Sequence, residues 1–181
     1  MTAVPEIRFP EFEGDWAVSL FGDLLKTLPT KSNQIYSTEI QVEGNFPVVD
    51  QGAKRVAGFS NKREKVFSSI PVIVFGDHTA ITKFIDFPFV VGADGTKIIS
   101  VKSAETDIRF AHYALQANPV PQEGYKRHFS ILKGMEFGFP TLPEQQKIAA
   151  FLGAVDDKID ALRRKHDGLK QFKAGLMQRL F

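Results

Sequence analysis

TLPEQQKIAAFLGAVDDKIDALRRKHDGLKQFKAGLMQRLF, residues 141–181, predicts one long helix. Thr141, Leu142, Pro143 and Glu144 have the pattern of a capping box with proline in the first turn, and no proline follows. At 1.5 Å per residue, an unbroken helix over the last 39 residues is about 58 Å long. We expect an arm of that length to need a partner.

Apolar residues recur along this stretch at the heptad spacing that is typical of a coiled coil. One seam position holds Ile148, Val155, Leu162, Leu169 and Leu176, and the other holds Leu152, Ile159, His166, Lys173 and Leu180. Eight of these ten positions are apolar. Residues 143–181 are therefore predicted to form a coiled-coil arm that mediates dimerisation and acts as a spacer.

Two alternatives to a straight, paired arm remain open on the sequence. The helix can fold back on its own domain, since Gly153, Gly168 and Gly175 each weaken an isolated helix by about 1 kcal/mol. The polar seam residues His166 and Lys173 are candidates for selecting the register of pairing. They would instead be exposed if the helix bent or ended near Gly168.

The preceding residues predict a globular domain, 1–142, and an α+β fold class for the chain. Gly, Pro, Asn or Asp interrupts the sequence every eight to twelve residues, with short runs of Val, Ile and Phe between them. The strands expected to form its mixed or antiparallel β core are residues 46–50, 56–60, 71–75, 81–91 and 97–101. Apolar spacings of three and four predict a short helix over residues 106–118, capped by Thr106.

Composition excludes several classes of protein. The 181 residues are 43% hydrophobic and 24% charged, which indicates a folded domain rather than a disordered chain. Cysteine is absent, so the chain has no disulfide, thiolate metal site or cysteine nucleophile. No stretch is long and apolar enough to span a membrane, and the N-terminus lacks the pattern of a signal peptide. We therefore expect a soluble, cytoplasmic protein.

Basic residues concentrate in the middle of the chain, where they are candidates for neutralising phosphates. Residues 51–142 have a net charge of +4, whereas residues 1–50 have −5. The clusters are Lys54, Arg55, Lys62, Arg63 and Lys65, and then Lys126, Arg127 and His128. A turn with Asp77, His78 and Thr79 follows a predicted strand and has groups able to hydrogen-bond to bases. The alternatives are a solvated charged face and a turn that satisfies its own backbone.

The sequence carries no complete catalytic motif. Asp156, Asp157 and Lys158 approach the carboxylate–lysine group of a metal-dependent nuclease, but on the predicted arm a solvated helix face is the favoured interpretation. Residues 118–121 depart from the adenine methyltransferase motif, and no glycine-rich loop accompanies them. No phosphate-binding loop is present, and the four histidines lack zinc-site spacing. We expect no catalytic residue, metal or cofactor in this chain.

Three blocks of sequence resemble one half of the specificity subunit of type I restriction-modification systems. They are PEIRFPEFEGDW with LFGDLL near the start, then FPVVDQGAKRVAGFS, VIVFGDHT and FPFVVGADGTKII, and finally residues 141–181. The last block is the most specific, because it combines the Leu-Pro-Glu-Gln-Gln start, the Ile-Ala-x-Phe-Leu run, the Asp-Asp-x-Ile element and the Lys-x-Gly-Leu-Met-Gln end. The first two blocks resemble a target-recognition domain and the last a conserved helical region.

The resemblance implies a noncatalytic subunit that recognises one half of a bipartite double-stranded DNA target. Members of this family dock methyltransferase (modification) subunits and, through them, restriction subunits, in the prokaryotic cytoplasm. Those partners use S-adenosylmethionine, ATP and Mg²⁺, and none of these needs to touch this chain. The resemblance also implies that residues 54–65, Asp77 to Thr79 and Tyr125 to His128 face DNA.

The sequence departs from that family in length, because it carries one recognition domain and one conserved helix instead of two. We expect two copies to pair head to tail through residues 148–180 and to recognise an inverted repeat. A truncated form of a longer chain is an equally open explanation. The alternative function is a coiled-coil scaffold or protein-interaction module without DNA specificity.

Overall fold

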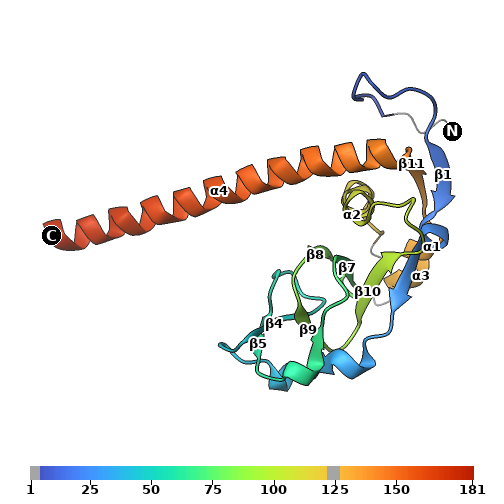
Figure 1. The fold of residues 1–181 in the computed structure, drawn as a ribbon. Helices are drawn as coiled ribbons and strands as arrows, with labels where there is room; N and C mark the ends of the chain where they lie inside the picture. Colours follow the sequence, from blue (N-terminus) through green and yellow to red (C-terminus); the bar gives the residue numbers. More distant parts are fainter. Residues whose placement is uncertain (1–4, 122–126) are drawn as a thin grey trace.

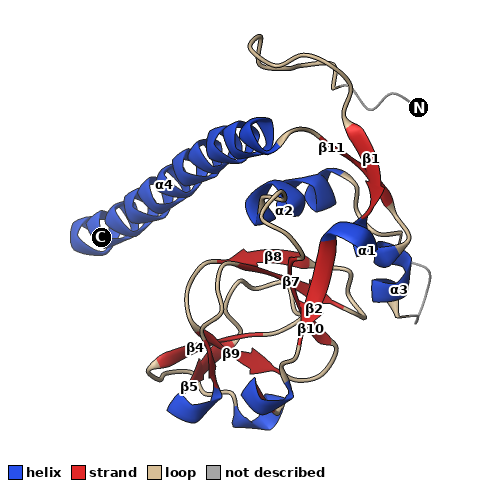
Figure 2. Cartoon of the chain, turned by 45° about the vertical axis from the view of Figure 1, so that its right-hand side comes forward, coloured by secondary structure: helices blue, strands red, loops and turns tan. Residues whose placement is uncertain are grey.

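The computed structural model describes residues 5–121 and 127–181, which form a mixed α+β domain and a projecting helix (Figures 1 and 2). The strands are β1 Ala17–Leu20, β2 Leu25–Leu28, β3 Gln34–Ile35, β4 Phe46–Val49, β5 Gly58–Ser60, β6 Val66–Phe67, β7 Val72–Gly76, β8 Thr82–Ile85, β9 Phe89–Gly92, β10 Thr96–Val101 and β11 Glu136–Phe139. The α-helices are α1 Phe21–Leu24, α2 Ile108–Ala117, α3 His128–Lys133 and α4 Leu142–Leu180, and the 3₁₀ turns are η1 Lys31–Asn33, η2 Ser37–Glu39 and η3 Arg63–Lys65.

Two sheets share a core that is centred on β7. One sheet has the order β2-β10-β7-β8 and is antiparallel, and the other has the order β3-β9-β4-β5, with β6 paired to β9. In the second sheet β9 runs parallel to β3 and β4, so the fold is mixed as expected. Strand side chains alternate between faces. Ile73 and Phe75 of β7 therefore pack toward the cluster that contains α2 residues, whereas Val72 and Val74 pack toward the second sheet.

The structure corrects two details of the strand and helix predictions. The predicted strand 81–91 is two strands, β8 and β9, which belong to different sheets. They separate at residues 86–88, where Pro88 has no backbone N–H to donate to a ladder. The cap of α2 is Asp107, whose Oδ1 accepts a hydrogen bond from the Phe110 amide at 2.8 Å, whereas Thr106 is a buried neighbour.

The start of α4 is held by the N-terminal segment of the chain. Helix α4 begins at Leu142 as predicted, but Thr141 makes no side-chain cap and Glu144 does not fold back on the helix. The Glu144 side chain instead accepts two hydrogen bonds of 2.7 Å from Arg8, together with one of 3.3 Å from the Trp16 indole. Antiparallel pairing of β1 with β11 brings these segments together, with Ala17 opposite Phe139.

Helix α4 then leaves the domain as a single, uninterrupted helix (Figure 1). Ile148 and Leu152 are partly buried, but seam residues from Val155 onward are exposed, including Leu162 at 54% and Leu169 at 58%. The helix neither ends at Gly168 nor folds back on the domain over its second half, and His166 and Lys173 are both exposed. Within the described residues, no helix is both long and apolar enough to cross a membrane.

His112 of α2 is a buried titratable group at the boundary between α2 and β8. Its ring lies 5.9 Å from the Phe84 ring, centre to centre, and its Nε2 atom has no hydrogen-bond partner among the described residues. Burial lowers the pKa of His112 to about 4, because the charged imidazolium would lose its hydration. His112 is therefore neutral in the folded protein at neutral pH.

We predict that Glu144→Gln lowers the free energy of unfolding by about 2 kcal/mol, because it removes the charge from a buried acceptor of charged hydrogen bonds. Urea denaturation followed by circular dichroism measures this loss. Glu136→Gln, at an exposed position on β11, is the matched control and should change little. Equal stability of the two variants would contradict a stabilising role for the Arg8–Glu144 pair.

We also predict that His112 makes stability depend on pH between about 6.5 and 4. The unfolded chain, with the ordinary histidine pKa of 6.5, binds a proton that the folded chain does not. Stability should therefore fall as pH drops through this range, by up to about 3 kcal/mol. His112→Leu should flatten the dependence measured by urea denaturation, whereas the exposed-site variant His166→Ala should keep it. A steep dependence in His112→Leu would refute the assignment.

Candidate nucleic-acid interface

Three loops meet at one end of the two sheets and present polar side chains together. They are residues 50–53 after β4, residues 77–80 after β7, and residues 93–95 between β9 and β10. The Thr79 hydroxyl donates to the Gln51 carbonyl oxygen at 2.7 Å, and the His78 amide donates to the Gln51 side-chain oxygen at 3.3 Å. Gly95 closes the cluster, since a Cβ atom there would lie 2.7 Å from the His78 ring.

Asp50 shapes the first of these loops. Its Oδ1 atom accepts a hydrogen bond from the Gly52 amide at 2.9 Å, which is an Asx turn. Lys83 supports the loop from β8, because its Nζ atom donates to the Asp50 carbonyl at 2.8 Å. Burial lowers the pKa of Lys83, although Asp50 opposes the shift. Lys83 therefore acts within the structure and is not a free surface cation.

Two of the predicted contact residues, Asp77 and His128, are buried. Asp77 is 4% exposed, and its Oδ1 atom accepts a hydrogen bond from the Phe129 amide at 3.0 Å. His128 is 1% exposed, and its backbone amide and Nδ1 atom both contact the Asp77 carbonyl, at 2.9 and 3.0 Å. These contacts attach α3 to the end of β7, so we omit both residues from the contact surface proposed below.

The other residues of the predicted turn lie at the loop cluster. His78 is exposed and Thr79 is partly buried. Asp77 and Thr79 bond to backbone groups of the remote residues Phe129 and Gln51, and the contact of the exposed His78 with DNA stays a prediction. Hydrogen bonds of this kind hold the loop in place, and so fix the position from which the exposed His78 side chain extends before any ligand binds.

In the basic run 54–65 the side chains of Lys54, Arg55, Lys62 and Arg63 are exposed and Lys65 is partly buried, and they differ in how they are held. Lys54 and Arg63 make no ion pair within residues 5–121 and 127–181. Arg55 pairs with Asp86 at 3.1 Å and lies over the Phe87 ring, whereas Lys62 pairs with Glu39. The bond to Glu39 raises the pKa of Lys62.

Only part of the last predicted cluster, Tyr125 to His128, lies within the described residues. Arg127 is exposed and precedes α3 directly. Tyr125 and Lys126 lie outside the described residues, so their placement stays a prediction.

Gln51 is a candidate contact that the sequence argument missed. The signal was the Asp-Gln-Gly turn at residues 50–52, directly after a predicted strand and before Lys54 and Arg55. An amide side chain is suited to base recognition, because it offers a donor and an acceptor together. The turn at 76–79 stood out more in the sequence, and only the fold brings Gln51 beside it.

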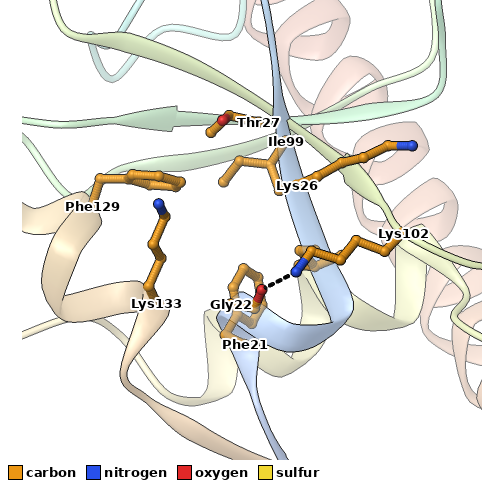
Figure 3. Close-up of a pocket in the computed structure, with 9 residues that line it drawn as sticks. Phe21, Gly22, Lys26, Thr27, Ile99, Lys102, Phe129 and Lys133 are labelled. Atoms are coloured by element: carbon orange, nitrogen blue, oxygen red, sulfur yellow. Dashed lines mark hydrogen bonds between the residues drawn. The ribbon is translucent and has the colours of Figure 1, made fainter.

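A second cleft of about 270 Å³ lies at the opposite end of β10. Figure 3 shows Lys102 and Lys133 on either side of it, with Phe21, Ile99 and Phe129 in the wall and Lys26 extending away. The Lys102 ammonium donates to the Gly22 carbonyl at 2.7 Å, and the Lys133 ammonium lies 4.9 Å from the Phe129 ring centre. The cleft extends from Ile99 in the middle of β10 to Lys102 beyond its end, and the amide of Phe129 in its wall donates to Asp77 at 3.0 Å.

Comparisons with known proteins agree on one family. The model of the type I restriction modification DNA specificity domain matches residues 13–171. The specificity subunit of the Escherichia coli type I restriction enzyme EcoR124I/EcoR124II is 30% identical over 81 residues, which are 43% of this chain and 20% of that protein.

Solved structures share the fold at low sequence identity. An S subunit of a type I restriction-modification system from M. genitalium has a TM-score of 0.68 at 19% identity, covering 89% of this chain and 43% of its own. The HsdS subunit of Thermoanaerobacter tengcongensis has a TM-score of 0.52 at 15% identity, covering 90% and 42%. The chain thus spans less than half the length of these relatives. Because the family model covers most of its residues, the chain belongs to the type I restriction modification DNA specificity domain family.

Proposed function

We propose that this chain is a noncatalytic subunit that recognises one half of a bipartite double-stranded DNA target. The observation that carries the proposal is the loop cluster around Gln51 and His78, which holds polar groups in fixed positions, with the exposed Lys54 and Arg55 following Gln51 closely in sequence. Phosphate contacts set register on a duplex, and contacts to base edges give sequence specificity. Lys54 and Arg55 follow the Gln51 loop directly, whereas Arg63 follows β5, whose Ser60 pairs with Phe46 at the other end of β4.

In this proposal Lys54, Arg63 and Arg127 neutralise phosphates, with Arg55 exchanging Asp86 for a phosphate. Gln51 and His78 reach base edges in the major groove, where each base pair has a distinct pattern of donors and acceptors. The two loops are joined by hydrogen bonds from the Thr79 hydroxyl to the Gln51 carbonyl and from the His78 amide to the Gln51 side-chain oxygen. That rigidity limits the entropy lost on binding.

We further propose that two copies pair head to tail through α4. An antiparallel arrangement with full overlap would place opposite each other Ile148 and Leu180, Leu152 and Leu176, Val155 and Lys173, Ile159 and Leu169, and Leu162 and His166. It would bring Asp156 and Asp157 near Lys170 and Lys173 of the other copy. A parallel pair in register would instead place like charges together, which costs free energy. Charge therefore favours the antiparallel pair.

The pair would dock the methyltransferase subunits, which supply catalysis with S-adenosylmethionine, and through them the restriction subunits. One related solved structure concerns complex assembly and conformational transition of the type I R-M system, with a TM-score of 0.54 at 17% identity. By this proposal the protein acts in the cytoplasm of a prokaryote. A coiled-coil scaffold without DNA specificity is the second candidate, and the exposed apolar seam favours it.

We predict that selection from randomised duplex DNA, with the chain and its methyltransferase partner, enriches an inverted repeat with a constant spacer. Leu169→Asp places a charge in the seam, so it should yield a monomer by light scattering and lose that two-part motif. Gln171→Asp, which adds the same charge at an exposed position off the seam, is the matched control. An undivided or asymmetric motif would overturn symmetric pairing, and no enrichment would favour the scaffold.

We also predict that phosphate contacts and base contacts separate by salt dependence. Replacing Lys54 and Arg55 together with alanine should weaken binding to every duplex and reduce the slope of log K against log salt by about 2. Gln51→Ala should keep the slope and relax one base position, as measured by fluorescence anisotropy on single-base variants of the selected site. Replacing Lys26 and Lys133 together, near the second cleft, is the control. If the salt slope changed in the Lys26 and Lys133 variant but not in the Lys54 and Arg55 variant, the DNA-binding surface would lie at the second cleft instead of the loop cluster.

A further inference from the structure

Helix α4 meets the recognition domain closely at Gly153. This glycine is buried against α2, and a Cβ atom there would lie 2.8 Å from Arg109 Nη1 and 3.8 Å from the Tyr113 hydroxyl. Gly168 and Gly175 have no neighbouring atom within 4 Å of the same position. Glycine therefore has a packing reason at 153 that it lacks further along the arm.

Polar contacts flank the close approach. The Tyr113 hydroxyl donates to Asp156 Oδ2 at 2.7 Å, and burial together with this hydrogen bond raises the pKa of Tyr113 to about 12. Arg109 is held on its other side by the Phe84 ring at 4.6 Å and by Asp86 at 3.6 Å. Asp156 is thus a bonded group of the interface rather than part of a wholly solvated face.

The contact between Gly153 and α2 borders an open cleft. A cleft of about 520 Å³ separates α4 from β8, with Asp160 and Arg163 on the helix side and Lys83 on the sheet side. Beyond it every described residue from 161 to 170 is exposed. Figures 1 and 2 show the arm continuing past the domain from this region. Its direction therefore depends on contacts made in its first four turns.

Gly153 also lies off the seam of α4. It follows Ile148 by five residues, and at about 100° per residue it points away from the seam residues Ile148 and Leu152. A change at Gly153 therefore alters the contact with α2 without entering the surface that would pair with a second copy.

We propose that the contact of Gly153 with Arg109, together with the Tyr113–Asp156 hydrogen bond, sets the angle of the arm and so the spacing between the two half-sites. The inference rests on the proposed function for its consequence in DNA, but the angle itself is a property of the chain. These residues position the recognition loops and do not contact DNA.

Helix α4 is long enough beyond Gly153 for a small change of its angle to move its end by several ångströms. The Arg8–Glu144 pair fixes the helix near its start, and Gly153 lies about 16 Å from Leu142, the first residue of the helix. Moving the helix by about 2 Å at Gly153 would swing the end of a helix about 58 Å long by about 7 Å. That displacement equals about two base-pair steps of B-form DNA.

The test compares Gly153→Leu with Gly168→Leu in the full chain. Both add the same side chain to α4, but only the first meets α2. In selections with the methyltransferase partner, Gly153→Leu should enrich the wild-type half-sites at a spacing changed by one to two base pairs. Gly168→Leu should keep the wild-type spacing. Wild-type spacing in Gly153→Leu would overturn the proposal.

A second measurement separates this inference from the proposed function. The chain has no cysteine, so Glu64→Cys and Lys170→Cys give two specific sites for spin labels, one on the domain and one on the arm. Labelled chain diluted into an excess of unlabelled chain reports distances within one copy. Gly153→Leu should shift this distance by several ångströms, and an unchanged distance would refute the angle device even if no DNA motif is found.

Tyr113→Phe tests the hydrogen bond without adding volume, which covers the case in which Gly153→Leu fails to fold. It should broaden the distribution of spin-label distances and of selected spacers while leaving the half-sites unchanged. Tyr36→Phe, at an exposed position remote from α4, is the control. Equal widths in Tyr113→Phe and wild type would overturn the contribution of Tyr113.

Discussion

The bidentate pair between Arg8 and Glu144 is the contact on which the arrangement of domain and arm depends. It joins side chains that are 136 residues apart in sequence, and the carboxylate is 1% exposed. A buried carboxylate is costly unless it is fully hydrogen-bonded, and here Arg8 and Trp16 both donate to it. The same contact determines where α4 begins, because the N-terminal segment and the helix start are fixed together.

Local sequence patterns predicted where the helices and strands lie better than they predicted which elements and residues contact each other. The heptad spacing from Ile148 to Leu180 identified a helix that the structure contains, and five short apolar runs marked strands. The split of residues 81–91 between two sheets was missed, because alternation continues through residue 89 while the pairing partner changes. The predicted capping box at residue 144 failed for a similar reason, since its partner Arg8 is remote in sequence.

Burial explains why the candidate site was only partly predictable. Asp77, His78 and Thr79 are adjacent in sequence, yet Asp77 is buried against α3 and His78 is exposed. His128 follows two basic residues but its ring points into the structure. A charge cluster in sequence gives residue types without their directions, so Gln51 became a candidate only when the loops were seen side by side.

Helix α4 contacts the recognition domain over its first half and is exposed over its second half. Gly153 and Asp156 contact the recognition domain, whereas the seam from Val155 onward is exposed for pairing. In a two-fold pair each arm carries its own copy of the domain contact, so any change of angle acts twice and symmetrically. The recognition loops lie on other elements, near Gln51 and His78. In the proposed function, loop substitutions would therefore change the bases that are recognised, while the contact at Gly153 would keep the separation of the half-sites constant.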